Sequence, residues 1–544
     1  NSIVSGGNYN VVVGDEAGTA ITTGDYNVFV GFVAGDATTT GRENIAMGGY
    51  SLGSNTTGTN NTAVGSGSLQ SNTTADNNTS VGYNSLAANT TGDRNVAMGG
   101  LALDANTTAD GNTAFGYDSL STNTGSELNV AIGFNALRLY NNSSGSGYNT
   151  AVGALAGAAV TTGVQNTLIG GQAGAAITTA NNNTALGKSA LGATTTGGSN
   201  VAIATNALGL NTTGGANVAI GQDTLYNNTT ASNNTAVGHN AMVANTTGSE
   251  NLASGTLSLA TNTTGANNVG LGYDALRANT TASNNTAVGF RSLSSNTTGI
   301  GNVAVGKSAL GANTTANNNV ALGLQTLETN TTGTQNTGLG NYALNNSTTA
   351  SNNTAVGYSA LIANTTGAQN TAVGQAAGDA LTVGSYNVAL GQNALSSDTQ
   401  GSQSVAIGSS ALFTQNFTSA TAANNTAVGH GAGAAVTTGT ACTLIGSLAG
   451  DAITTGSFNT YIGREAGGAT TTGTYNTFIG TGTIAGTGNF GAGSLVTTGS
   501  KNAFLGGYNG NQNGLDLRTS SNNIVLSDGD GNPRGVFNSG GQFM

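Results

Sequence analysis

Residues 61–77 read NTAVGSGSLQSNTTADN, and this 17-residue pattern recurs along nearly the whole chain. Each repeat opens on Asn, or on a small residue in its place, and continues with alternating β-branched and small residues up to a Gly. A Leu occupies the ninth position and an Asn-Thr-Thr triplet starts at the twelfth. A fixed period of this kind predicts an all-β solenoid in which each repeat forms one coil of a parallel stack.

The openers give the number of coils and the places where the period breaks. There are about 29 coils, interrupted by insertions near residues 137–148, 413–423 and 481–495. We therefore expect a β-solenoid rod over residues 1–506, on the order of 140 Å long if the coils are spaced like strands in a sheet. The openers are Asn10, Asn27, Asn44, Asn61, Asn78, Asn95, Asn112 and Asn129, then every 17th residue from Asn149 to Ser404, then Asn425, Cys442, Asn459, Asn476 and Asn502.

The first residues of each coil alternate with a period of two, which predicts a short β-strand. Thr62 and Val64 then point to one face, and Ala63 and Gly65 to the other. We expect the β-branched face to fill the coil interior. The nearly flat Ala/Gly face would permit very close approach of another backbone, and we expect it to form the contact between chains.

The ninth and twelfth positions exchange volume in a subset of coils. Where Gly157 replaces the ninth-position Leu, Val160 replaces the twelfth-position Asn. Because close-packed interiors conserve total volume, both positions should face inward. The exchange is incomplete in two coils, at Gly35 with Thr38 and at Gly467 with Thr470. We expect the Asn residues to occupy turns and to stack as ladders along the solenoid.

Composition excludes several classes of protein. Only 6% of the 544 residues are charged, 88 are Gly, and the net charge is −11, so no basic surface for nucleic acid or anionic membranes is expected. No apolar run reaches membrane-spanning length, and no signal peptide is visible. Cys442 is the single cysteine, which rules out an intrachain disulfide framework.

The opening motif resembles the head repeats of trimeric autotransporter adhesins. It appears here as residues 129–133, NVAIG, and again at 217–221 and, with Ser first, at 404–408. This resemblance implies a left-handed parallel β-roll and packing of three chains into a homotrimer. The coil of 17 residues is longer than the repeat of that family.

The C-terminal segment, residues 507–544, carries a second resemblance. Residues 521–541 read as a β-hairpin with a polar turn. The segment looks like the one that precedes a self-cleaving chaperone domain in many bacteriophage tail fibres. It is expected to form a hairpin cap at the end of the solenoid.

No catalytic or cofactor-binding constellation can be assembled from the sequence. His239 and His430 follow the coil Gly at a variable position and are expected to be solvated. We therefore expect a protein that is not an enzyme and needs no cofactor. Asp528, Asp530 and Asn532 have the spacing of a calcium loop but lack its later residues, so a plain turn is favoured over a metal site.

Aromatic residues in the insertions are the candidates for contact with a ligand or receptor. They are Tyr140, Phe413, Phe417 and Phe490. Exposed aromatics in loops suit binding, whereas core packing is the competing role. Asn-Thr-Thr triplets, for example at Asn72, fit the N-glycosylation pattern, but we interpret them as turn residues.

These patterns favour a homotrimeric bacteriophage tail fibre at the virion surface or outside the cell. It would bind a host cell-surface glycan or protein through many weak contacts, without nucleic acid and without inserting into a membrane. The alternative is a bacterial surface adhesin or a self-assembling extracellular filament. An ice-binding solenoid is a weaker alternative, because the adjacent Thr73 and Thr74 cannot both face one flat surface.

Overall fold

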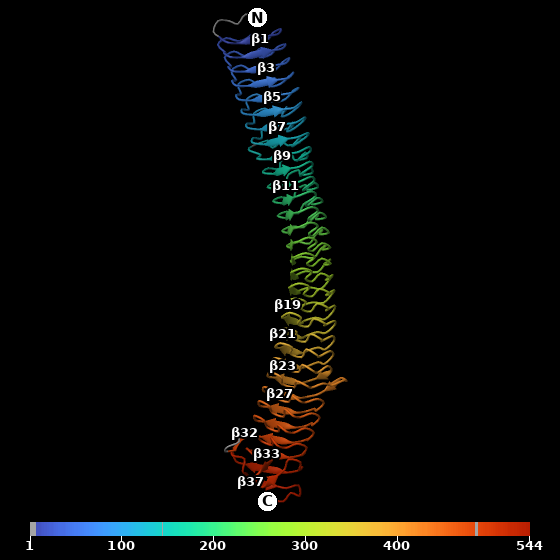
Figure 1. Cartoon of the computed structure of the whole chain (residues 1–544). Coiled ribbons are helices and arrows are strands. Elements are labelled where there is room, and N and C mark those ends of the chain that lie inside the picture. The colour runs from blue at the N-terminus through green and yellow to red at the C-terminus, as the bar shows by residue number, and fades with distance from the viewer. Residues whose placement is uncertain (1–6, 144, 485–487) are drawn as a thin grey trace. The chain divides into compact units, whose positions relative to one another are not determined.

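The computed structural model describes residues 7–143, 145–484 and 488–544, and these residues form strands and turns without an α-helix. The chain divides into two compact units, residues 1–268 (unit 1) and residues 269–544 (unit 2). Each unit is a parallel β-solenoid in which strands about 17 residues apart lie side by side (Figure 1). The predicted fold class is confirmed.

The described residues of unit 1 form fifteen strands that pair in chain order. They are β1 (Val11–Val13), β2 (Val28–Val30), β3 (Ile45–Met47), β4 (Thr62–Val64), β5 (Thr79–Val81), β6 (Val96–Met98), β7 (Thr113–Phe115), β8 (Val130–Ile132), β9 (Thr150–Val152), β10 (Thr167–Ile169), β11 (Thr184–Leu186), β12 (Val201–Ile203), β13 (Val218–Ile220), β14 (Thr235–Val237) and β15 (Leu252–Ser254). The register places identical coil positions opposite each other, as Val201 opposite Val218.

Unit 2 continues the same pattern. Its coil strands are β16 (Val269–Leu271), β17 (Thr286–Val288), β18 (Val303–Val305), β19 (Val320–Leu322), β20 (Thr337–Leu339), β21 (Thr354–Val356), β22 (Thr371–Val373), β23 (Val388–Leu390), β25 (Val405–Ile407), β27 (Thr426–Val428), β28 (Thr443–Ile445), β29 (Thr460–Ile462), β30 (Thr477–Ile479), β33 (Ala503–Leu505) and β36 (Ile524–Ser527). β37 (Pro533–Phe537) pairs antiparallel with β36, which confirms the predicted C-terminal hairpin.

The described residues of unit 2 form three further short pairings, two at the insertions and one in the C-terminal segment. β24 (Gly401–Ser402) pairs in parallel with β26 (Thr421–Ala422) beside the second insertion. β31 (Thr481–Ile484) and β32 (Gly488–Gly491) form an antiparallel hairpin within the third insertion. β34 (Asn511–Gln512) pairs antiparallel with β35 (Leu515–Asp516) ahead of β36.

The two faces of each coil strand are the reverse of what the alternation predicted. In β4 the central Ala63 is fully buried, whereas Thr62 and Val64 are half-exposed. The interior is thin, and the opposite wall already supplies a large side chain: the fully buried Leu69 at coil position nine. A small residue at position three therefore leaves room for Leu, and the β-branched residues remain on the outer, pleated surface, where they favour strand geometry.

Positions nine and twelve face inward, as the volume exchange predicted. Leu69, Asn72 and Val160 are all fully buried. The incomplete exchanges are now explained by position three. An ideal Cβ on Gly35 would lie 2.6 Å from the ring of Phe29, so the ring occupies the space that a ninth-position Leu would fill.

Two ladders of Asn carboxamides run along the interior. The Asn61 Oδ1 accepts the backbone N–H of Asn78 on the next coil (3.0 Å), and the Asn61 Nδ2 donates to the carbonyl of Ala75 (2.8 Å). The Asn72 Nδ2 donates to the Asn55 Oδ1 on the preceding coil (2.9 Å). Buried carboxamides that are satisfied in this way close each coil and fix its register.

The Gly at coil position five is required by close packing of neighbouring coils. Gly65 has φ +128°, and an ideal Cβ there would lie 2.5 Å from the carbonyl oxygen of Gly82. Any side chain would therefore collide with the next backbone, and the conformation itself disfavours residues other than Gly.

Candidate binding surfaces

The outer face of the coil strands carries a column of exposed aliphatic side chains. In unit 1 the fourth coil position is apolar in every strand from β1 to β14, and in β15 it is Ser254. In unit 2 it is Val, Leu or Ile in every coil strand. Exposed fractions reach 57% at Val13 in unit 1 and 53% at Leu505 in unit 2. A charge-free apolar stripe of this extent is unusual for a surface that faces only water.

Aromatic side chains flank this column on both sides. At the coil position just before the opener, Tyr9 stacks on Tyr26 with ring centroids 4.9 Å apart. At position six, Tyr273 stacks on Phe290 with centroids 5.4 Å apart. These rings are exposed, in contrast to the usual placement of aromatics in a core. The sixth position also holds His239 and His430, which are exposed as predicted.

The aromatic candidates in the first two insertions separate into packed and exposed residues. Tyr140 is fully buried, and its hydroxyl lies 3.0 Å from the Ser126 Oγ. Burial raises the pKa of Tyr140. Phe417 is 6% exposed, whereas Phe413 is 38% exposed. Tyr140 and Phe417 therefore pack the loops against their coils, and of these three candidates Phe413 is the exposed one.

A buried carboxylate holds the second insertion. Asp398 replaces the twelfth-position Asn of its coil and is fully buried. Its Oδ1 accepts the backbone N–H groups of Gly401 (2.9 Å) and Phe417 (3.2 Å), and its Oδ2 accepts a bond from the Gln415 Nε2 (2.6 Å). These donors account for the carboxylate's hydrogen bonds and give it a structural role.

A side of the coils formed by positions seven, ten and eleven is hollowed in both units. One hollow of about 340 Å³ in unit 1 includes Ala175, Ala193 and Gly209. One of about 350 Å³ in unit 2 includes Ser308 and Gly311. Small residues at positions ten and eleven leave these spaces between successive coils.

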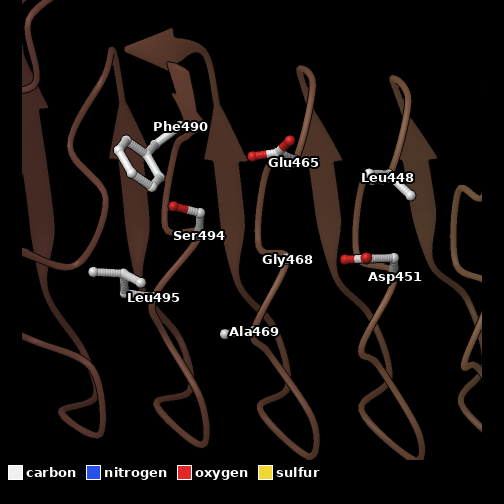
Figure 2. Close-up of a pocket in the computed structure, with 8 residues that line it drawn as sticks. All are labelled: Leu448, Asp451, Glu465, Gly468, Ala469, Phe490, Ser494 and Leu495. Carbon is white, nitrogen blue, oxygen red and sulfur yellow. The ribbon is translucent and has the colours of Figure 1, made fainter. Parts of the chain in front are cut away.

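A third hollow, lined by two carboxylates, a hydroxyl and an aromatic ring, lies beside the β31–β32 hairpin (Figure 2). Its volume is about 310 Å³. Phe490, the fourth aromatic candidate, is half-buried and lines it. Its other lining residues are Leu448, Asp451, Glu465, Gly468, Ala469, Ser494 and Leu495. Burial and, secondarily, the charge of Glu465 raise the pKa of Asp451.

In the C-terminal turn, the residues with calcium-loop spacing form hydrogen bonds to one another and to Arg534. The Asp528 Oδ1 accepts backbone N–H groups from Asp530 (3.1 Å) and Asn532 (2.8 Å). The Arg534 guanidinium bonds the other carboxylate oxygen and holds the pKa of Asp528 at about 2. These contacts support the turn interpretation. Among the described residues, no group of three or more His, Cys, Asp or Glu could hold a metal ion.

The Asn-Thr-Thr triplets are part of the interior. The Asn72 side chain is fully buried, and its Nδ2 donates to the carbonyl of Ala75 (3.1 Å). A glycan on that nitrogen would have to displace the Asn ladder. Thr73 donates its hydroxyl to the carbonyl of Thr90 (3.1 Å), whereas Thr74 is exposed, so the two Thr columns do not form one surface.

Cys442 takes the place of an opener Asn and is buried. Its backbone N–H donates to the Asn425 Oδ1 (2.9 Å), which preserves that half of the ladder. Burial raises the pKa of its thiol, which disfavours the reactive thiolate.

No protein-family model matches the chain, and no match was found among curated proteins. No helix in the described ranges has the length and apolar character needed to cross a membrane.

Proposed function

We propose that the chain is the shaft of a bacteriophage tail fibre, a homotrimer that attaches to a host surface through multivalent, non-covalent contacts. It acts by binding and not by catalysis. The observation that carries this proposal is the exposed aliphatic column at the fourth coil position. This column replaces the Ala/Gly face as the expected contact between chains, because the Ala residues are inside.

The period of the column supports other copies of this chain as its partner. Each coil contributes one residue to the column, so successive side chains lie about 4.8 Å apart, which is the spacing between neighbouring strands. A partner that covers it along its length must present side chains at the same spacing. A second and third copy of this chain, aligned in parallel and in register, meet that requirement at every coil.

The energetics favour association over many coils. Burying the exposed part of one aliphatic side chain contributes about 1 kcal/mol. The contribution is repeated at successive coils, whereas the entropic cost of association is incurred once for each chain. The strength of the contact therefore grows with the number of coils that match.

Multivalent attachment follows from threefold repetition. Each chain would present its own copy of Phe413 and Phe490, so that three identical weak sites act together on one surface. The flanking aromatics at coil position six, such as Tyr117 and Phe134, supply further apolar contact area.

The experiment that tests this proposal is the solution mass of the full chain by light scattering, paired with negative-stain electron microscopy. The expected mass is three times the 52.8 kDa of one chain, in particles on the order of 140 Å long. A mass of one chain would overturn the proposal. Filaments of indefinite length would overturn it in favour of self-assembly.

A further inference from the structure

The hollow beside the β31–β32 hairpin differs from the two hollows described above in having an aromatic ring and two carboxylates, whereas the unit 2 hollow around Gly311 has one carboxylate, Glu328, together with Arg291. All three lie at coil positions seven, ten and eleven. The hollow around Ala175 in unit 1 is lined by Ala, Gly, Leu, Ser and Gln. The hollow beside the hairpin combines two carboxylates, a hydroxyl and an aromatic ring in about 310 Å³. That volume lies near the lower end of the range for ligand pockets, which suits a single small ring.

Its polar groups are arranged along successive coils. Figure 2 shows the carboxylates of Asp451 and Glu465 on neighbouring coils, both directed toward the coil that carries Ser494. Arg464 pairs with Glu465 at 2.7 Å. Ser494 is 9% exposed, and its Oγ has no hydrogen-bond partner among the described residues. A buried hydroxyl without a partner is costly unless a ligand or water completes it.

The hairpin supplies the apolar side of the hollow. β32 ends at Gly491, where the backbone of Glu465 leaves no room for a side chain, so the hairpin base is pressed onto that coil. The carbonyl of Ala492 accepts the backbone N–H of Gly467 (2.8 Å), which anchors the strand to the same coil. Phe490 is thereby held at the rim of the hollow, where its ring can pack against an apolar ligand face.

We propose that this hollow is a subsite for one neutral sugar ring. The inference rests on the proposed function and names the ligand class at one of its contact sites. Sugar hydroxyls donate to the Asp451 and Glu465 carboxylates, and hydrogen bonds to ionised acceptors are the stronger kind. The C–H face of the ring packs on Phe490. The Asp451 carboxylate, beside the Glu465 carboxylate that Arg464 pairs, leaves the hollow with a net negative charge, which disfavours anionic sugars by like-charge repulsion.

The test is saturation-transfer difference NMR of the full chain with the methyl glycosides of glucose, galactose and mannose, and with sialic acid as the anionic probe. The expected result is transfer to at least one neutral glycoside and none to sialic acid. The Phe490→Ala and Ala469→Leu variants should abolish the transfer, the first by removing the ring and the second by filling the hollow. The Asp451→Asn variant should weaken binding roughly tenfold or more.

The matched control is Ala193→Leu, which fills the unit 1 hollow at the same coil position and should leave the transfer unchanged. Absence of transfer to every neutral glycoside, or transfer that survives both Phe490→Ala and Ala469→Leu, would overturn the subsite. The solution mass separates this result from the proposed function. A trimer without transfer removes the subsite alone, whereas transfer to a single-chain protein removes the fibre proposal alone.

Discussion

Two kinds of coil fill the same interior in different ways. In the coil opened by Asn217, Ala219 at position three faces Leu225 at position nine, and the Asn228 carboxamide belongs to the second ladder. In the coil opened by Asn459, Tyr461 occupies position three and Gly467 position nine. The large side chain therefore comes from position nine in the first coil and from position three, on the opposite wall, in the second. The interior thus conserves its volume while either wall can supply it.

The exchange also relieves the backbone. The ninth residue adopts a left-handed conformation in both kinds of coil, with φ +52° at Leu225 and +63° at Gly467. This conformation strains the backbone of Leu but not that of Gly. In unit 2 the aromatic side chains at position three stack along the solenoid, with ring centroids 4.9 Å apart for Tyr461 and Phe478. In these unit 2 coils an aromatic stack therefore replaces leucine packing, whereas other coils with Gly at position nine place Val, Ile or Leu at position twelve.

The strongest test of this exchange converts one kind of coil into the other. Tyr461→Ala alone should destabilise its coil by about 4 kcal/mol through the cavity it leaves, and Gly467→Leu alone by about 3 kcal/mol through collision with the Tyr461 ring. The double variant should cost less than either single change, because it recreates an Ala/Leu coil. Local opening free energies from hydrogen exchange measure all three, since a long solenoid need not unfold in one step. Additive costs would show that positions three and nine do not share one space.

A smaller effect is expected from the Asn ladder, which coils of the Ala/Leu kind retain at position twelve. Asn228→Ala should destabilise its coil by about 1–3 kcal/mol, because it leaves partners on both neighbouring coils unsatisfied. The Asn228 Nδ2 bonds the Asn211 Oδ1 at 2.9 Å, and the Asn245 Nδ2 bonds the Asn228 Oδ1 at 2.8 Å. Asn227→Ala, at the neighbouring half-buried position, is the control and should cost less, because the Asn227 Nδ2 makes a single bond to the Val243 carbonyl (2.9 Å) and does not belong to the ladder. Equal exchange rates in the two variants would contradict a structural ladder.

The smallest effect concerns a carboxylate in the Gly378 coil. Burial raises the pKa of Asp379 above its ordinary value. The folded state therefore binds a proton on the Asp379 carboxyl more tightly than the unfolded state does. The contribution of Asp379 to stability falls as the pH rises from its ordinary pKa through its raised pKa. Asp379→Asn should raise the melting temperature slightly at neutral pH and remove part of the loss between acidic and neutral pH. Thermal melts at several pH values measure this, and an unchanged pH profile would count against it.

The period of the sequence was sufficient for the fold, the coil boundaries and the inward positions nine and twelve. It misassigned the strand faces because alternation alone does not say which face is inside. Phe29 and Tyr461 could have shown which face is inside. Each stands at position three in a coil whose ninth residue is Gly and whose twelfth is Thr, so only an inward position three completes the volume.

The candidate surfaces were less predictable. Tyr140, Phe413 and Phe417 all lie in insertions, and their sequence context does not distinguish a loop-packing ring from an exposed one. The hollow beside Phe490 depends on Asp451 and Glu465, which lie on successive coils and come together only through stacking. Counting in steps of 17 would have placed them on the same side of the solenoid.

The outward aliphatic column, covered by other copies of the chain, is the central claim, and maleimide labelling of single cysteines tests it most directly. Val237→Cys and Thr247→Cys place a thiol on two exposed positions of one coil, on and away from the column. Buried Cys442 provides a low background in both variants. The account predicts that Cys at 237 reacts many times more slowly than Cys at 247 in the native protein and at a similar rate after denaturation. Equal rates in the native protein would contradict it.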